Sequence, residues 1–409
     1  METYKQISDD VLLSQPIRTT HVAPRSHKTQ RSVQHRYVDL NEDVLREILS
    51  HADIQSVFLL CQVNKTLCHQ HDDLFRQIYQ HHYRQTGMDV FKTDMTWFQL
   101  LKLCYQLSLL LTLPSLKNYK MIVLYIMTTL NLSYSNIIVL PPEIGQLRAL
   151  QYLNVAYNQL SALPPQIGKM CALQKLDLSK NQLSALPPEI GQLNHLQYLD
   201  LSHNRLSALP PEMGQLSALQ DLYLSYNQLS ALLPEIGQLS HLIYLNLSNN
   251  QLNALPPEVG HMSDLQELSL SHNQLSALPP EIGQLVDLKY LYLYDNKLRA
   301  LPPQIGQLGA LQKLDLSNNQ LSELPPEMSH LIHLKYLYLI NNQLSTLPPE
   351  MGKMSHLHYL NLSNNKLIAL PQELGQMSHL NYLNLMDNKL SSAFTNKLIR
   401  QLPNTSIYR

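Results

Sequence analysis

Four side chains that can bind zinc stand close together in the first third of the chain: Cys61, Cys68, His69 and His71. Thiolate and imidazole are the usual ligands of structural zinc, but the spacing of these four residues matches no common zinc finger. Cys61 and Cys68 fall two turns apart on an expected helix, where both would face the same packed interior. The pattern therefore favours core packing, and the sequence predicts neither a metal nor a cofactor.

Motifs of nucleotide-binding and hydrolytic enzymes are missing from the sequence. It contains no phosphate-binding P-loop, no dinucleotide-binding Gly-x-Gly-x-x-Gly and no serine nucleophile elbow. Many histidines of the second half, such as His195, His241 and His379, occupy one recurring place before a leucine, which is typical of a solvated surface. We therefore expect a protein that is not an enzyme.

Composition and charge exclude several classes of partner. Charged residues make up 15% of the 409 residues, against a usual quarter, and the formal net charge is -1. Such a chain has no overall positive field to attract nucleic acid or an anionic membrane. Its four cysteines are too few for a disulfide framework, and no apolar run is long enough to span a bilayer. Since the N-terminus shows no signal peptide, we expect a cytoplasmic or nuclear protein.

An internal repeat supplies the elements that would position functional side chains. From Asn158 to Asn388 an asparagine recurs every 23 residues, and Ser135 takes its place one period earlier. Each period also places apolar residues at constant offsets, in one copy Leu219, Leu222, Leu224, Leu229, Leu232 and Ile236. One unit alone cannot bury these side chains, so neighbouring units must stack and share a continuous core.

The repeat resembles a known family. One copy reads Leu-Gln-Asp-Leu-Tyr-Leu-Ser-Tyr-Asn-Gln-Leu over residues 219–229, and another continues as Leu-Pro-Pro-Glu-Ile-Gly-Gln-Leu over residues 278–285. These segments resemble the leucine-rich repeat family, in its 23-residue intracellular class. The resemblance implies an α/β solenoid, a horseshoe of about twelve repeats whose concave face is a parallel β-sheet.

The residue types within each copy predict its local structure. Alternating leucines indicate a short strand, and the asparagine amides should form a ladder of hydrogen bonds to neighbouring backbone groups. Paired prolines should prevent a regular helix start and favour an extended, turn-rich convex side. Glycines such as Gly237 should supply positive φ. We expect local irregularities where Leu233, Ser329 and Gln372 replace a proline or a glycine.

The first third of the chain has a different character. Residues 1–36 are polar and lack an apolar period, which predicts a disordered arm. Residues 37–84 carry apolar stripes at helical spacing, with Asn41 placed to cap the first helix, and predict a small all-α module. Residues 85–126 then predict a helical connector that shields the exposed end of the first repeat.

The far end of the solenoid needs a second cap. The repeats themselves occupy residues 127–390, and residues 391–409 come after the last of them. Terminal repeats need a closing element because each repeat touches only its neighbours. The side chains expected to close this end are Phe394, Leu398, Ile399 and Leu402.

The all-α module resembles an F-box. The resemblance runs from Leu-Asn-Glu-Asp-Val-Leu-Arg-Glu-Ile-Leu-Ser at residues 40–50 to Asp-Leu-Phe at 73–75. Asn41 stands where that family usually has proline, Ala52 replaces a leucine and Phe75 replaces a tryptophan. The resemblance implies docking to the Skp-type adaptor of a cullin–RING ubiquitin ligase through Leu40, Asn41, Val44, Leu45, Val63, Asn64 and Lys65. The alternative is a three-helix cap that only shields the first repeat.

The register of the repeat determines which side chains face the concave side. These lie six, four and two residues before each asparagine, and eleven of the 22 tyrosines fall there. The repeat framework needs no tyrosine at those places, and tyrosine anchors many protein interfaces. We expect the target-binding residues to be Tyr244, Tyr290, Tyr292, Tyr294, Tyr336, Tyr338 and Ile340, with Lys289 and Lys335 beside them to steer an acidic partner. Alternatively, the alternating tyrosines only echo duplicated repeat units.

Taken together, the sequence predicts a protein-interaction adaptor. It would be the substrate-recognition subunit of an SCF-type (cullin–RING) ubiquitin ligase, with the Skp-type adaptor, the cullin and an unidentified protein target as partners, and no nucleic acid or membrane. Such partners require a eukaryotic cytoplasm, so the chain would belong to a eukaryote or be the effector of a virus or bacterium that infects one. The alternative is a scaffold that binds a signalling protein such as a small GTPase, without ligase docking.

Overall fold

The computed structural model describes residues 126–409, apart from the side chains of residues 392–395, together with Arg76 and Gln80. The disordered arm, the F-box-like module, the connector and the zinc candidates predicted from sequence all lie outside the described residues. The described part of the chain holds the repeat array and its C-terminal end.

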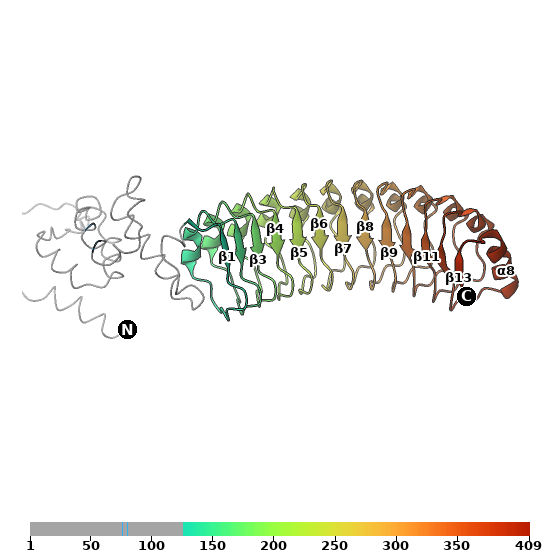
Figure 1. The fold of residues 1–409 in the computed structure, drawn as a ribbon, viewed down its shortest axis with the longest axis horizontal. Coiled ribbons are helices and arrows are strands. Elements are labelled where there is room, and N and C mark those ends of the chain that lie inside the picture. Colours follow the sequence, from blue (N-terminus) through green and yellow to red (C-terminus); the bar gives the residue numbers. More distant parts are fainter. Residues whose placement is uncertain (1–75, 77–79, 81–125) are drawn as a thin grey trace, which may run out of the picture. The chain divides into compact units, whose positions relative to one another are not determined.

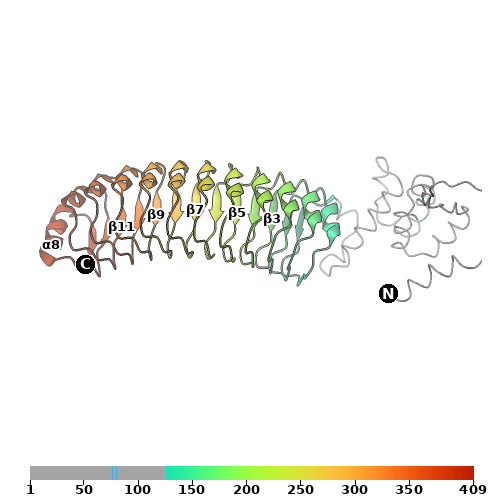
Figure 2. The ribbon, with the colours of Figure 1, turned by 180° about the vertical axis from the view of Figure 1, so that it is seen from behind.

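The repeats form one parallel sheet of 13 strands, arranged in sequence order (Figure 1). Each strand has three residues, and Figure 2 shows the same succession of levels from behind. The strands are β1 (Thr129–Asn131), β2 (Tyr152–Asn154), β3 (Lys175–Asp177), β4 (Tyr198–Asp200), β5 (Asp221–Tyr223), β6 (Tyr244–Asn246), β7 (Glu267–Ser269), β8 (Tyr290–Tyr292), β9 (Lys313–Asp315), β10 (Tyr336–Tyr338), β11 (Tyr359–Asn361), β12 (Tyr382–Asn384) and β13 (Ser406–Tyr408).

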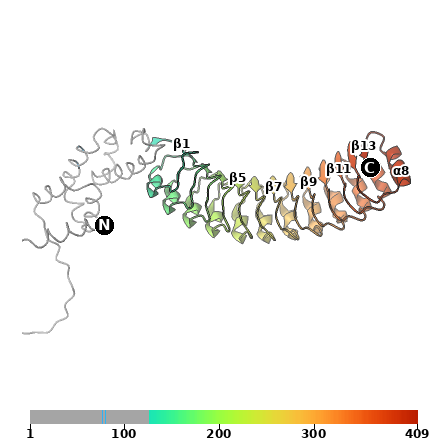
Figure 3. The ribbon, with the colours of Figure 1, turned by 90° about the horizontal axis from the view of Figure 1, so that it is seen from below.

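A short 3₁₀-helix follows each strand from β1 to β11 on the opposite side of the array, which curves with the sheet on its concave side (Figure 3). Neighbouring turns stack as the strands do. The helices are η3 (Pro142–Gln146), η4 (Pro165–Lys169), η5 (Pro188–Gln192), η6 (Pro211–Gln215), η7 (Pro234–Gln238), η8 (Pro257–His261), η9 (Pro280–Gln284), η10 (Pro303–Gln307), η11 (Pro326–His330), η12 (Pro349–Lys353) and η13 (Gln372–Gln376).

The paired prolines therefore start helices, which corrects the expectation of an extended convex side. Pro187 has extended backbone angles, and Pro188 is the first residue of η5. A proline is tolerated there because the first helical N–H has no partner within the helix. The expected irregularities are also absent from the described repeats: Leu233 precedes a regular η7, Ser329 lies within η11, and Gln372 starts η13.

The core lies between the sheet and the 3₁₀-helices. The middle residue of each repeat strand is a leucine, and those of β5 and β6, Leu222 and Leu245, are completely buried. Ile190 and Ile282 pack from the helical side and are equally inaccessible. This core is shared between levels, as the repeat pattern predicts.

The asparagine ladder predicted from the sequence is confirmed. The Asn181 amide donates to the carbonyl of Val155 in the preceding repeat at 2.9 Å and to Leu178 of its own repeat at 3.1 Å. Its Oδ1 accepts the N–H of Leu160 at 3.0 Å. The ladder amides from Asn158 to Asn365 are buried with their donors and acceptors matched, which is the condition for placing a polar group in a core.

The role predicted for the glycines is wrong. None of the described glycines has a left-handed backbone. A β-carbon on Gly237 would instead lie 2.3 Å from the backbone oxygen of Glu258 in the next repeat, so the residue is required for close approach of two levels. The left-handed position belongs to the residue before each asparagine, as at Tyr226 and His272, whose φ angles are 55° and 54°.

The C-terminal end has a cap with an additional strand. Helix α8 (Ser392–Gln401) comes after the last repeat, and β13 then pairs with β12. Leu398 and Leu402 are buried as expected, whereas Ile399 is 39% exposed and does not close the core. The side chain of Phe394 lies outside the described residues. Among the helices of the described part of the chain, none has the length and apolarity needed to cross a membrane.

Candidate functional site

The strands present alternate side chains to the concave side of the array. In β1–β12 the middle leucine points into the core, so the first and third residues face outward from the sheet. Neighbouring strands pair in constant register, with Tyr290 beside Lys313 and Lys313 beside Tyr336. We call these first and third residues, together with the residue two places after the third, the inner face.

The predicted cluster of tyrosines is divided by a strand. Tyr290 and Tyr292 belong to β8, and Tyr336 and Tyr338 to β10, while β9 lies between them. The Lys313 ammonium of β9 lies 4.9 Å from the ring centroid of Tyr292 and 5.3 Å from that of Tyr338. A cation near two ring faces joins the two halves by cation–π attraction. The sequence prediction omitted Lys313, although its inner position was readable from the register.

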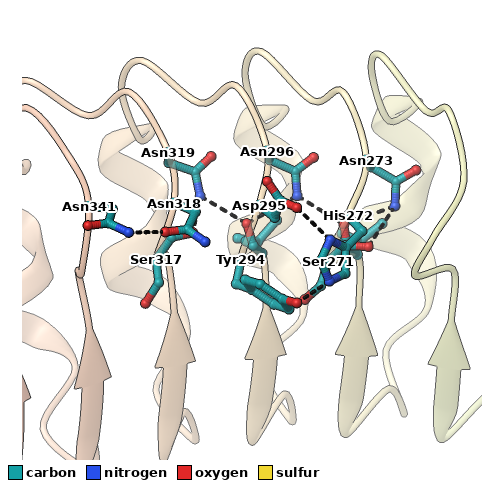
Figure 4. A network of polar contacts seen from close by, with 12 residues as sticks. Ser271, His272, Asn273, Tyr294, Asp295, Asn296, Ser317, Asn318, Asn319 and Asn341 are labelled. Atoms are coloured by element: carbon teal, nitrogen blue, oxygen red, sulfur yellow. Dashed lines mark hydrogen bonds and ion pairs between the residues drawn. The ribbon is translucent and has the colours of Figure 1, made fainter.

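Tyr294, also predicted to bind the target, takes part in a polar network (Figure 4). Its hydroxyl contacts Nε2 of His272, and His272 Nδ1 lies 2.5 Å from the Asp295 carboxylate. The two rings meet edge-on with their centroids 4.3 Å apart. Ile340, a bulky residue at the same repeat position, is half-buried two repeats further on. The ring faces at the centre are therefore those of Tyr292 and Tyr338.

The remaining predicted residues surround this centre. Lys289 is half-buried and donates from Nζ to Gln266 Oε1 at 2.9 Å, while Lys335 is exposed. Tyr244 lies on β6, two strands from Tyr292, with Glu267 on the strand between them. The structure therefore places Tyr244 outside the central cluster.

Two runs of aromatic contacts cross the inner face, and the sequence analysis did not identify them. The first joins the rings of Tyr198, Tyr223 and Tyr244 at centroid distances of 5.2 Å and 4.8 Å. The second joins Tyr338, Tyr359, Tyr382 and Tyr408 at 4.8 Å, 4.3 Å and 5.1 Å. Register could have indicated both runs up to β12, but Tyr408 lies beyond the last repeat and gave no periodic signal.

Carboxylates stand among the tyrosines of the first run. Burial raises the pKa of the Asp200, Asp221 and Glu267 carboxyls above the ordinary value. Burial, followed by the charge of Asp221, also raises the pKa of the Tyr223 hydroxyl to about 12. The inner face thus holds negative groups in a poorly hydrated, aromatic setting.

This arrangement offers several kinds of contact to another chain. A hollow of about 460 Å³ lies on the first strands, lined by residues that include Tyr152, Lys175 and Tyr198. Within the described residues no group of three or more acidic, histidine or cysteine side chains is arranged to hold a metal ion. Rings, carboxylates and a cation on an open curved sheet are groups that recognise protein side chains. The predicted adaptor-docking residues, from Leu40 to Lys65, lie outside the described part of the chain.

Comparison with known families identifies the repeats. The family model described as "Leucine rich repeat" matches residues 171–229, 219–275, 240–298, 263–321 and 332–390, more than half of the chain. A second model, "Leucine Rich repeats (2 copies)", matches residues 310–349. The comparison with curated proteins gives no match.

Several solved structures are similar. A leucine-rich repeat protein of Leptospira interrogans is 37% identical, with TM-score 0.52, over 72% of this chain and 87% of its own. The plant peptide hormone receptor RGFR1, solved in complex with RGF2, is 32% identical with TM-score 0.52, over 64% of this chain and 48% of its own. An internalin of Listeria monocytogenes, InlF, is 22% identical with TM-score 0.64, over 75% of this chain and 87% of its own. At that identity the likeness concerns the fold alone. The stacked strands, the asparagine ladder and these matches agree that the chain belongs to the leucine-rich repeat family.

Proposed function

We propose that the protein is a non-enzymatic interaction module that binds a protein or peptide partner on its inner face. The observation that carries the proposal is the position of the Lys313 ammonium near the rings of both Tyr292 and Tyr338. This contact orders side chains from three strands before any partner arrives, which lowers the entropic cost of binding. Leucine-rich repeat proteins generally act as binding scaffolds, and the similar receptor RGFR1 was solved with RGF2 bound.

The binding experiment compares two double variants of the full chain. Tyr292→Ala with Tyr338→Ala removes the central rings, and truncation of such anchors often costs about 2 kcal/mol or more. The control, Tyr157→Ala with Tyr226→Ala, removes two exposed tyrosines that precede the ladder asparagines. Proximity labelling in a eukaryotic cell should lose its targets with the first pair only. Loss with the control pair alone would place the binding site elsewhere.

A finer proposal concerns what the module does with its partner. The F-box resemblance of residues 40–75 supports docking to a Skp-type adaptor and cullin, and it is a resemblance of sequence alone. The full chain should capture the purified adaptor, and Lys65→Glu should abolish capture while leaving the melting temperature unchanged. If the wild-type chain does not bind the adaptor at high micromolar concentration, the protein is better described as a scaffold that does not dock to a ubiquitin ligase.

A further inference from the structure

We infer that the inner face over β5, β6 and β7 docks a basic segment of the partner, with an arginine or lysine side chain over Tyr244 between Asp221 and Glu267. The inference rests on the proposed function, because it assigns a partner chemistry to the same face. It concerns a different part of that face, whose last strand β7 pairs with β8, the strand that carries Tyr292.

The three residues occupy one position on three consecutive strands. Asp221 pairs in register with Tyr244, and Tyr244 pairs in register with Glu267. Strands of a sheet are about 4.8 Å apart, so the two acidic residues stand on backbones separated by about 10 Å, with the phenol ring between them. The ring of Tyr223 lies beside that of Tyr244 at 4.8 Å and extends the apolar bed.

Within the described part of the chain, Asp221 and Glu267 differ from the other inner-face acids in lacking a hydrogen-bond partner. Asp177, Asp200 and Asp315 each accept the N–H of the serine two residues later. By contrast, no hydrogen bond or ion pair to Asp221 or Glu267 side chains occurs within the described residues. Half-buried carboxylates without donors are costly to keep charged, and they favour a ligand that supplies a cation.

The surrounding charges do not neutralise the pair. Burial is the largest influence and raises the pKa of both carboxyls, against the smaller opposing charges of Lys175 at Asp221 and Lys313 at Glu267. A guanidinium or ammonium group of a partner would be attracted by both carboxylates, and its charge would offset the free-energy cost of burying them.

The chain itself shows how a cation sits on such a surface. Lys313 Nζ lies 4.9 Å and 5.3 Å from the ring centroids of the inner-face residues Tyr292 and Tyr338. Tyr244 has no cation of its own among the described residues. Arginine and lysine stack on tyrosine faces in this way, and the carboxylates on either side add charge-assisted hydrogen bonds.

A metal ion fits this place poorly. Calcium needs six to eight oxygen ligands at about 2.3–2.6 Å from one point, whereas a ring separates these two carboxylates. No larger group of metal-binding side chains occurs in the described residues. Because the face is a wide curved sheet, the cation is carried by a chain segment that extends over several strands.

The test uses the full chain and three synthetic peptides, which alternate glycine with arginine, glutamine or glutamate. Isothermal titration should show binding of the arginine peptide and none of the glutamate peptide. Asp221→Asn with Glu267→Gln should weaken the arginine peptide at least about tenfold, a loss of about 1.4 kcal/mol. Tyr244→Leu should weaken it as well, while Tyr244→Phe, which keeps the aromatic face, should retain binding.

The matched control, Glu189→Gln with Glu212→Gln, removes the same charge from η5 and η6 on the convex side. It should leave the affinity unchanged. No binding of the arginine peptide, equal binding of the glutamate peptide, or an unaffected Asp221–Glu267 variant overturns the inference. If the Tyr292–Tyr338 variant loses cellular targets and the Asp221–Glu267 variant keeps them, the proposed function holds and the basic partner is wrong.

Discussion

The side-chain amide of Asn250 donates to the backbone carbonyl of Leu224, one repeat earlier, at 2.9 Å. Its Oδ1 accepts the N–H of Leu229 at 3.0 Å, so one buried side chain satisfies two groups of the neighbouring repeat. The asparagine that recurs in the sequence thus forms hydrogen bonds between neighbouring repeats. A core of leucines is non-directional, and these amides supply the directional contacts that hold one register.

Replacing a ladder asparagine should destabilise the array. Asn250→Ala leaves the buried N–H of Leu229 without its acceptor and removes one of the two amide donors to the Leu224 carbonyl, which keeps Asn227. We expect a loss of about 1–3 kcal/mol from the one unsatisfied buried group. Denaturant titration measures it. Gln251→Ala, at the exposed neighbouring residue, should change stability by less than about 0.5 kcal/mol. Equal effects of the two substitutions would contradict a structural role for the ladder.

Two glycines should respond oppositely to alanine. Gly237→Ala drives a β-carbon against the Glu258 carbonyl, and we expect a cost of about 1–3 kcal/mol from overpacking. Gly309→Ala meets nothing within 4 Å, so a gain of up to about 1 kcal/mol is expected from a stiffer unfolded chain. Melting temperatures should therefore move in opposite directions. Ser329 occupies the equivalent position in η11, which shows that one level accommodates a side chain there.

The Asp221 and Glu267 carboxyls should make stability depend on pH. Burial raises both pKa values, so the folded state holds these protons more tightly than the unfolded state. Their contribution is greatest below the ordinary carboxyl pKa of about 4 and is lost as pH rises through the raised values. Asp221→Asn with Glu267→Gln should therefore be more stable than the wild type near neutral pH, and the two proteins should converge in acid. A constant difference across thermal melts at several pH values would refute this.

The charge of Lys313 should be detectable through the pKa of the Glu267 carboxyl. Burial raises the pKa of Glu267, and the charge of Lys313 opposes that rise. Lys313→Met should therefore raise the Glu267 pKa further, as followed by carboxyl carbon NMR. Lys366→Met, which removes an exposed lysine that donates to Gln343, is the control and should leave Glu267 unchanged.

The C-terminal cap should depend on one face of α8. Leu398 is 2% exposed, and Leu398→Ala should cost about 2–4 kcal/mol through the cavity it leaves. Its neighbour Ile399 is 39% exposed, and Ile399→Ala should cost less than about 0.5 kcal/mol. Chemical denaturation of both variants measures the contrast. A similar cost for both would mean that the helix packs on a different face.

The sequence predicted the strands, the inward register and the amide ladder, because each depends on a period that holds over the repeats. It could not predict contacts that depend on side-chain reach. Lys313 and Tyr294 both belong to the inner face. Lys313 extends toward the rings of Tyr292 and Tyr338, whereas the Tyr294 hydroxyl contacts His272. The glycine prediction failed for a related reason: the constraint at Gly237 comes from the next repeat's carbonyl, which has no signature in local sequence.

The strand spacing also sets a limit on any regular ligand. Rungs of the sheet recur at about 4.8 Å, whereas an α-helix repeats every 5.4 Å or so and an extended chain returns to one face after about 6.7 Å. The side chains of a ligand that runs across the strands therefore lose their match to the strand positions after a few levels. A regular ligand can therefore make matching contacts only over short groups of adjacent strands. The rings are distributed in that way, in one run from Tyr198 to Tyr244 and another from Tyr338 to Tyr408.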